Sequence, residues 1–152
     1  MSNYQVVFSS LQGSGSNNNS KIYNFDWTSI PESRYEVTFT FCADSTTSSL
    51  NVVNACIYVD IGITQSYEAS LLPNNISSSM LGTLNIINNF STTSRNFMVE
   101  TSFNPPTIIQ KRPNNNKVQV DICTFDAIKT LYPSSLGVIP AYVLTLNFRK
   151  LD

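Results

Sequence analysis

The segment Tyr35–Phe41 alternates strictly between apolar and polar side chains. Its odd positions are three aromatic residues and a valine, whereas its even positions are Glu36, Thr38 and Thr40. Successive side chains of a β-strand point to opposite faces, so this segment predicts a strand with one buried face. Such a strand needs a second layer to cover its apolar side. The chain is therefore expected to form a β-sandwich.

The segment Ile22–Trp27 shows the same alternation, with its three aromatic residues in one phase. Between the two segments, Ile30–Ser33 has turn chemistry, because Pro31 fixes φ and cannot donate to a ladder. We therefore predict that the two strands form a hairpin.

Other alternating or β-branched segments predict further strands. They are Tyr4–Leu11, Val52–Ile61, Met80–Ile87, Arg95–Phe103, Thr107–Gln110, Lys117–Thr124 and Tyr142–Phe148. Gly13–Ser16 and the asparagines that follow predict a flexible loop, and Gly82 is expected to mark a bulge. Thr64–Ser79 has no clear period, and a short helix is predicted only at Asp126–Leu131.

Eight or nine strands without a sustained helical period predict an all-β, antiparallel two-sheet sandwich. The chain length of 152 residues fits one domain, so 1–152 is expected to be a single jelly roll of about eight strands. An immunoglobulin-like sandwich is the alternative, but its Cys…Trp…Cys order is absent because Trp27 precedes every cysteine. The residues expected to face inward are Tyr35, Val37, Phe39, Ile57, Val59, Val118, Val120, Leu144 and Leu146. Lys117, Gln119 and Asp121 are expected to face outward.

Charged residues make up only 12% of the chain, against about 25% in a typical soluble domain. Clusters of Asn, Ser and Thr supply the polarity, and the formal net charge is −1. So small a net charge gives little repulsion between molecules and favours association. The composition predicts a surface that neighbouring chains cover, with a lightly charged extracellular sandwich as the alternative.

The three cysteines, Cys42, Cys56 and Cys123, form neither a complete disulfide framework nor a zinc signature. All three fall on the polar phase of their strands. We expect reduced thiols at a protein–protein contact or beneath a loop, although one disulfide and one free thiol remain an alternative. No signal-peptide pattern opens the chain and no apolar run approaches a membrane span, so residence in a reducing cytosol is expected.

The chain contains no histidine, which removes the commonest general base and metal ligand. The ten acidic residues are scattered singly, and no two share a catalytic motif. The basic pairs Lys111-Arg112 and Arg149-Lys150 are expected to flank turns or contact acidic neighbours, and a pI near 5.3 argues against nucleic acid. We therefore predict no catalytic, cofactor-binding or metal-binding residue, no cofactor, and no enzymatic activity.

Two aromatic residues leave a different function open. If Trp27 and Tyr23 were exposed, they could stack on a sugar, as in a carbohydrate-binding sandwich. The competing interpretation is that both cover the core of the first predicted hairpin.

Several segments together resemble a known family. They are Tyr23–Trp27, Ile30–Glu32 leading into Tyr35–Phe41, Tyr58–Gly62, Leu81–Leu84, Arg112-Pro113 with the asparagines after it, and Tyr142–Phe148. In this order they resemble small capsid proteins of large nucleocytoplasmic DNA viruses, over most of the chain.

The resemblance implies a single jelly roll that serves as a minor capsid protein. Such a protein would be made in the host cytoplasm and reside in the virion capsid, among or beneath major capsid proteins, joining capsomers. The implied partners are major and other minor capsid proteins, with a homo-oligomer possible. The family transfers no catalytic or binding residue.

Overall fold

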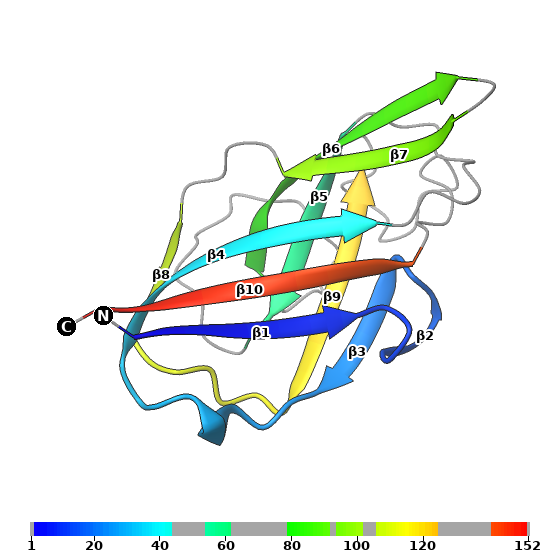
Figure 1. Cartoon of the computed structure of the whole chain (residues 1–152). Helices are drawn as coiled ribbons and strands as arrows, with labels where there is room; N and C mark the ends of the chain where they lie inside the picture. Colours follow the sequence, from blue (N-terminus) through cyan, green and yellow to red (C-terminus); the bar gives the residue numbers. More distant parts are fainter. Residues whose placement is uncertain are drawn as a thin grey trace.

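The computed structural model describes residues 2–43, 54–61, 79–91, 94–101, 106–124 and 141–151 (Figure 1). The described residues form ten β-strands and one short 3₁₀ turn, η1 (Trp27–Ser29). The strands are β1 (Asn3–Ser9), β2 (Ser14–Asn17), β3 (Ser20–Asn24), β4 (Arg34–Ala43), β5 (Asn54–Asp60), β6 (Ser79–Ser91), β7 (Ser94–Thr101), β8 (Thr107–Ile109), β9 (Lys117–Thr124) and β10 (Tyr142–Leu151). The predicted helix at Asp126–Leu131 and nearly all of the aperiodic segment before β6 lie outside these ranges.

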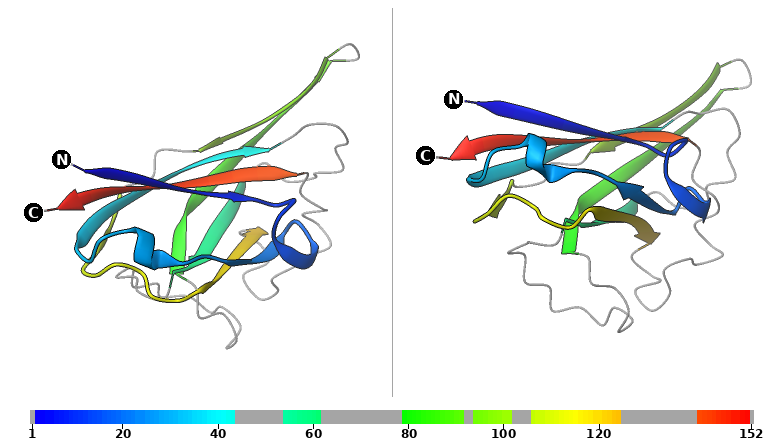
Figure 2. Two further views of the ribbon diagram at one scale, coloured as in Figure 1. Left: turned by 60° about the horizontal axis from the view of Figure 1, so that its bottom comes forward. Right: turned by 90° about the horizontal axis from the view of Figure 1, so that it is seen from below.

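The strands form two antiparallel sheets that lie one over the other (Figure 2). The four-stranded sheet has the order β1-β10-β4-β8, and the six-stranded sheet has the order β2-β3-β9-β5-β6-β7. This arrangement confirms the predicted all-β, two-sheet sandwich. The hairpin of β6 and β7 extends beyond the rest of the sandwich at one end (Figures 1 and 2).

The strand pairing is nested along the chain. The first strand, β1, pairs with the last, β10, and β3 pairs with β9. Further inward, β4 pairs with β8 and β5 pairs with β6. The chain therefore folds back on itself around its middle, with β2 and β7 added at the two edges of the six-stranded sheet.

Alternation in sequence correctly identifies the buried face of each central strand. All nine residues expected to face inward are buried, with exposed fractions from 0% to 8%. Ile61, directly after β5, is buried as well, as are Tyr142 and Phe148 of β10. Asp121 differs from its expectation: it occupies the outward phase of β9, yet its exposed fraction is 0%. Its carboxylate accepts a hydrogen bond from Gln119 Nε2 at 2.9 Å.

A chain of aromatic contacts fills the space between the sheets. Phe148 of β10 is central to it, with its ring centroid 5.6 Å from Trp27 and 5.9 Å from Tyr35, both in edge-on geometry. Phe25 continues the chain to Phe8 of β1, at 6.2 Å. Edge-on pairs of this kind contribute beyond their burial because the positive ring edge meets a negative ring face.

The predicted hairpin of Ile22–Trp27 with Tyr35–Phe41 is wrong. β3 and β4 belong to different sheets, and the strand ends at Asn24, so Trp27 lies in η1 instead. The reason is that alternation fixes which face of a strand is buried but does not identify its partner. Two neighbouring strands with aromatic faces can equally cover each other across a sandwich, and that is what the crossover through η1 produces.

The loop predicted at Gly13–Ser16 is also wrong in part, because Ser14–Asn17 forms the edge strand β2. The β2–β3 register shifts between Ser14 and Asn17, around Gly15 with φ of 144°. A Cβ there would collide with the backbone carbonyl of Ser20, so glycine permits this short strand. The bulge expected at Gly82 is confirmed, because Gly82 and Met80 pair with consecutive residues of β5.

Replacing Phe39 with alanine tests the buried face of β4. We expect Phe39→Ala to lower the free energy of unfolding by about 3–5 kcal/mol, because it removes a buried ring. Denaturant unfolding measures this. The control, Thr38→Ala on the exposed face, should change stability by no more than about 0.5 kcal/mol. A loss below about 1 kcal/mol for Phe39→Ala would contradict the assigned face.

A buried hydrogen bond between the sheets predicts a pH dependence. The Tyr23 hydroxyl of β3 donates to the Tyr142 hydroxyl of β10 at 3.2 Å, and burial raises the pKa of both groups, most strongly for Tyr142. In the unfolded chain both ionise near pH 10, whereas the folded protein retains the protons. Stability should therefore be intact below about pH 10 and fall as pH rises further, by up to about 1.4 kcal/mol per pH unit for each tyrosine.

Urea unfolding measured across this alkaline range checks the prediction. In the double variant Tyr23→Phe/Tyr142→Phe, neither position can ionise, so this part of the slope should disappear. Equal slopes in the two proteins would show that the pair does not hold its protons on folding.

Candidate functional site

The outer face of the four-stranded sheet carries a surface without charge. Three transverse rows follow from the register of β1, β10 and β4: Gln5–Asn147–Thr38, Val7–Thr145–Thr40 and Ser9–Val143–Cys42. None of these nine side chains is buried, and we call them the uncharged face. Their neighbours along each strand face the core, so alternation directs these nine side chains to the outer surface of the sheet.

On the same side of the sheet, the charged side chains lie at one end, beyond the row Gln5–Asn147–Thr38. The next row contains Arg149 and Glu36, which form an ion pair, and Arg34 follows one row further on. On the uncharged face, polar side chains bond to each other instead, as where Gln5 Nε2 donates to Asn147 Oδ1 at 2.9 Å. The sheet surface is thus divided into a short charged end and a longer uncharged part.

Apolar side chains collect toward the far end of the uncharged face. Val7 is 58% exposed and Val143 is 41% exposed. Leu11, in the turn directly after β1, is 82% exposed. Among the described residues, four large hydrophobic side chains are exposed, and three of them lie on the uncharged face or in the turn directly after β1. The fourth, Ile22, belongs to the other sheet. Covering them with another surface would be favourable, at about 25 cal/mol per Å² of apolar area.

The dimensions of the uncharged face limit what it can bind. Strands about 4.8 Å apart and rows about 6.7 Å apart give nine residues a flat area of about 300 Å². A stable interface buries about 800 Å² on each partner. The uncharged face is therefore the size of an interface core, and a rim around it must supply the remaining contact.

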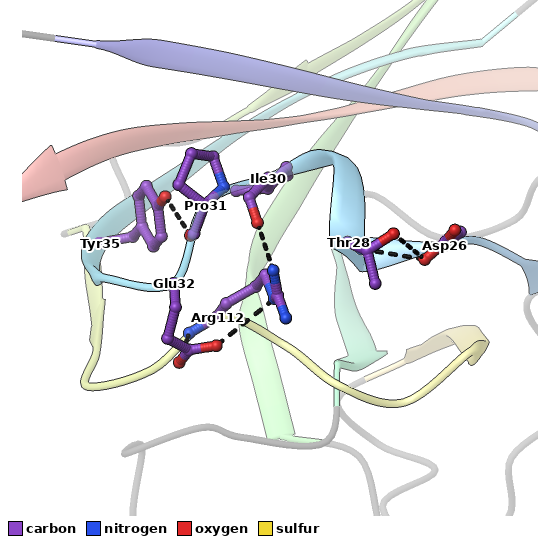
Figure 3. A network of polar contacts seen from close by, with 7 residues as sticks. All are labelled: Asp26, Thr28, Ile30, Pro31, Glu32, Tyr35 and Arg112. Atoms are coloured by element: carbon purple, nitrogen blue, oxygen red, sulfur yellow. Dashed lines mark hydrogen bonds and ion pairs between the residues drawn. The ribbon is translucent and has the colours of Figure 1, made fainter.

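A second concentration of polar contacts lies at the crossover between the sheets, around Arg112 (Figure 3). Arg112 Nη1 donates to the Ile30 carbonyl oxygen at 2.8 Å, and its Nε lies 3.5 Å from a Glu32 carboxylate oxygen. The Tyr35 hydroxyl donates to the Pro31 carbonyl oxygen at 2.7 Å. The two Arg112 contacts fasten the turn before β4 to the loop between β8 and β9, and the Tyr35 hydrogen bond joins the same turn to β4.

Asp26 begins the same crossover. Its Oδ1 accepts hydrogen bonds from the Thr28 backbone N–H at 2.9 Å and the Thr28 hydroxyl at 2.7 Å (Figure 3). The backbone hydrogen bond is the main reason that the pKa of Asp26 is lowered. A carboxylate held in its ionised form by a helix cap is a poor general acid. The carboxylates of the crossover thus have structural roles.

Trp27 and Tyr23, the candidates for sugar stacking, are both buried, with exposed fractions of 2% and 6%. The Trp27 ring lies 4.7 Å from that of Phe25, and its Nε1 donates to the Asn115 carbonyl oxygen at 2.8 Å. Neither ring offers a face to a ligand. Among the aromatic side chains whose exposure is described, none is exposed. The interpretation that these two residues cover the core is the one that the geometry supports.

Other expectations about sites have simple outcomes. One arginine of each basic pair contacts an acidic neighbour, as predicted: Arg112 contacts Glu32, and Arg149 contacts Glu36. Within the described ranges, no group of three or more Cys, Asp or Glu residues is placed to hold a metal ion. Nor does any described helix have the length and apolar character needed to cross a membrane.

Sequence reasoning missed the uncharged face. Its residues come from three segments that are far apart in the chain, and only the register of β1, β10 and β4 brings them together. The available signal was the polar phase of each strand, which lacks charge at Thr38 and Thr40 and again at Thr145 and Asn147. No protein-family model, curated protein or solved structure matches this chain.

Replacing Trp27 with alanine distinguishes a core role from a sugar-binding role. Because Trp27 is buried among aromatic rings, Trp27→Ala should lower the free energy of unfolding by about 3–5 kcal/mol. Leu11→Ala, at an exposed position, is the control and should be close to neutral. If the wild-type protein bound an oligosaccharide and Trp27→Ala lost that binding with its stability unchanged, the core role would be excluded.

Proposed function

We propose that this chain is a structural protein without enzymatic activity, which packs against other protein chains through the uncharged face. We propose further that it is a minor capsid protein, placed among or beneath major capsid proteins and joining capsomers. The observation that carries the proposal is the uncharged face itself: nine accessible residues on three strands, none of them charged.

The physical reason lies in desolvation. Burying an ionised group against a partner is expensive unless that group is paired, whereas amide and hydroxyl groups form new hydrogen bonds at lower cost. The core of a protein interface is correspondingly depleted of charged residues. The uncharged face has the same lack of charge, which supports a surface used for packing.

The nested pairing supports the proposed jelly-roll topology. With β2 and β7 set aside, the remaining eight strands pair first with last, second with seventh, third with sixth, and fourth with fifth. A long hairpin that rolls up into two sheets produces this order, and jelly rolls of eight strands are frequent in viral capsid domains. The topology and the resemblance in the sequence thus favour the same role.

The proposed partners are major capsid proteins and other minor capsid proteins, within a virion capsid assembled from chains made in the host cytoplasm. Because the uncharged face is only about 300 Å², a stable contact requires a rim. The exposed turn at Leu11 extends that surface at one end, and the charged row of Glu36 and Arg149 borders it at the other. A second copy of this chain could occupy the same surface in a homo-oligomer.

A charge placed in the middle row of the uncharged face, at Thr40, tests the proposal. Thr40→Lys should weaken association with assembled particles at least about tenfold, which corresponds to about 1.4 kcal/mol, because the ammonium group would be buried without a partner. Gradient sedimentation of particles with tagged protein gives the bound fraction. Cross-linking within those particles identifies the neighbouring chains.

The matched control is Asn114→Lys, which adds the same charge at an exposed loop position. It should leave association unchanged, and both variants should keep the unfolding midpoint of the wild type. A wild-type protein that stays monomeric and never sediments with particles would refute the capsid role. Equal binding by both variants would refute the assigned surface.

A further inference from the structure

The four-stranded sheet ends in β1, and β10 is the only described strand that pairs with it. Hydrogen bonds at both ends of β1 show which of its residues bond to β10. The Ser10 N–H donates to the Tyr142 carbonyl oxygen at 2.9 Å, and the Lys150 N–H donates to the Ser2 carbonyl oxygen at 3.1 Å. The register between these two ends is unbroken, and alternate residues of an antiparallel strand direct their backbone groups to the same partner. The even-numbered residues of β1 therefore bond to β10.

The odd-numbered residues of β1 direct their N–H and C=O groups away from β10. At Asn3, Gln5 and Val7, no described residue forms a hydrogen bond with these backbone groups. The Ser9 carbonyl oxygen accepts from the Gln12 N–H at 2.9 Å in the turn that follows, whereas the Ser9 N–H also points outward. Figure 1 shows β1 along the lower edge of its sheet, with no other labelled strand of that sheet beyond it. β1 thus presents a row of unused donors and acceptors.

The other sheet edges carry features that discourage the addition of a strand. β8, at the opposite edge of the four-stranded sheet, has only three residues and directly follows Pro106. In the six-stranded sheet, β2 has four residues and a shifted register, and β7 contains Arg95 and Glu100. β1 has seven residues and contains no proline, glycine, charge or bulge. Among the described edge strands, β1 alone lacks such protection.

The core is incompletely covered at this edge. Tyr4 of β1 packs against the core but is only half-buried, and its ring centroid lies 6.2 Å from that of Tyr35. Phe25 is half-buried as well, and its ring centroid lies 6.2 Å from that of Phe8 of β1. A strand added beside β1 would extend the sheet over this apolar surface, which is favourable.

We propose that two copies of this chain pair through β1, antiparallel about a two-fold axis at Val6, so that two four-stranded sheets become one sheet of eight strands. This register brings the outward-directed residues together and uses the whole of β1. Gln5 lies opposite Val7 of the partner subunit, and Asn3 lies opposite Ser9 of the partner subunit. Each such pair exchanges two hydrogen bonds, so the pairs and their symmetry mates supply about eight. A typical protein interface has roughly ten.

The sequence of β1 suits pairing with its own copy. At the centre, Val6 lies opposite Val6 of the partner subunit. On either side, Tyr4 lies opposite Phe8 of the partner subunit, and aromatic pairs across two strands are favourable. No residue of β1 is charged, so self-pairing sets no like charges opposite each other. These features favour a second copy as the occupant of this edge.

The pairing enlarges the uncharged face. The two-fold axis is perpendicular to the sheet, so both copies present the uncharged face on the same side. The row Gln5–Asn147–Thr38 continues into the partner subunit's Val7–Thr145–Thr40 row. The joined faces cover about 600 Å², closer to the roughly 800 Å² that each partner buries in a stable interface. The pairing itself does not depend on a capsid role.

The test uses the purified full chain. Sedimentation equilibrium gives the dissociation constant of the dimer, and hydrogen exchange measured over a range of concentrations locates the contact. The Gln5 and Val7 amides should exchange more slowly in the dimer, because both N–H groups become hydrogen-bonded. In a dimer with one isotope-labelled copy, NMR should detect the Tyr4 Hα close to the Hα of Phe8 of the partner subunit, because these residues form a non-hydrogen-bonded pair.

The substitution Val7→Pro removes an outward N–H that β10 does not use. Proline is tolerated at such a position of an edge strand, so the far-UV circular dichroism should match that of the wild type. Dimerisation should weaken at least about tenfold, because each dimer loses two symmetry-related hydrogen bonds. The matched control, Val7→Thr, keeps the N–H and a β-branched side chain, and its dissociation constant should stay within about threefold of the wild-type value.

The proposal is overturned if the wild type stays monomeric up to about 1 mM, or if the Gln5 and Val7 amides exchange equally fast in monomer and dimer. Equal weakening by Val7→Pro and Val7→Thr would assign the contact to the Val7 side chain and would also overturn the proposal. If Val7→Pro failed to fold, the amide exchange and the Hα contact of the wild type would decide. None of these measurements involves assembled particles, so a failure here is distinguishable from a failure of the capsid role.

Discussion

The contact between the two sheets is the constraint on which the rest of the structure depends. Phe148 of β10 contacts both Trp27 of the crossover and Tyr35 of β4, and Phe8 of β1 contacts Tyr23 of β3. These rings lie between the layers, so each contributing strand must keep its apolar phase directed inward. The outer phase of the same strands has no part in this packing and is available for other roles.

Alternation made the inner face predictable from the sequence but not the pairing of strands. β4, β9 and β10 were predicted with their buried faces because a period of two is encoded directly in their residues. The pairing partner of β3 could not be predicted, because aromatic side chains that face each other are compatible with a hairpin and with two strands in opposite sheets. β2 was missed because glycine and serine carry little signal for a strand, and its existence depends on the conformation of Gly15. The uncharged face required the register, because it joins residues that are distant in the chain.

The burial of Trp27 shows why exposure cannot be assigned from residue type. An isolated tryptophan near a chain turn is compatible with a ligand platform and with a core residue. Here its indole N–H has a backbone acceptor at Asn115, and its ring is enclosed by Phe25 and Phe148. The crossover that holds Trp27 is itself fastened by Arg112 to the Ile30 carbonyl and the Glu32 carboxylate. The polar contacts in this region therefore serve to position an aromatic side chain.

The uncharged face and the aromatic layer use opposite sides of the same strands, and this separation has a mechanical consequence. The uncharged face belongs to the outer phase of β1, β10 and β4, whereas the inner phase of these strands packs on the six-stranded sheet. A substitution on the outer phase therefore leaves the buried side chains between the sheets unchanged. A capsid component built in this way would change its contacts with neighbouring chains without losing the packing that holds its two sheets together.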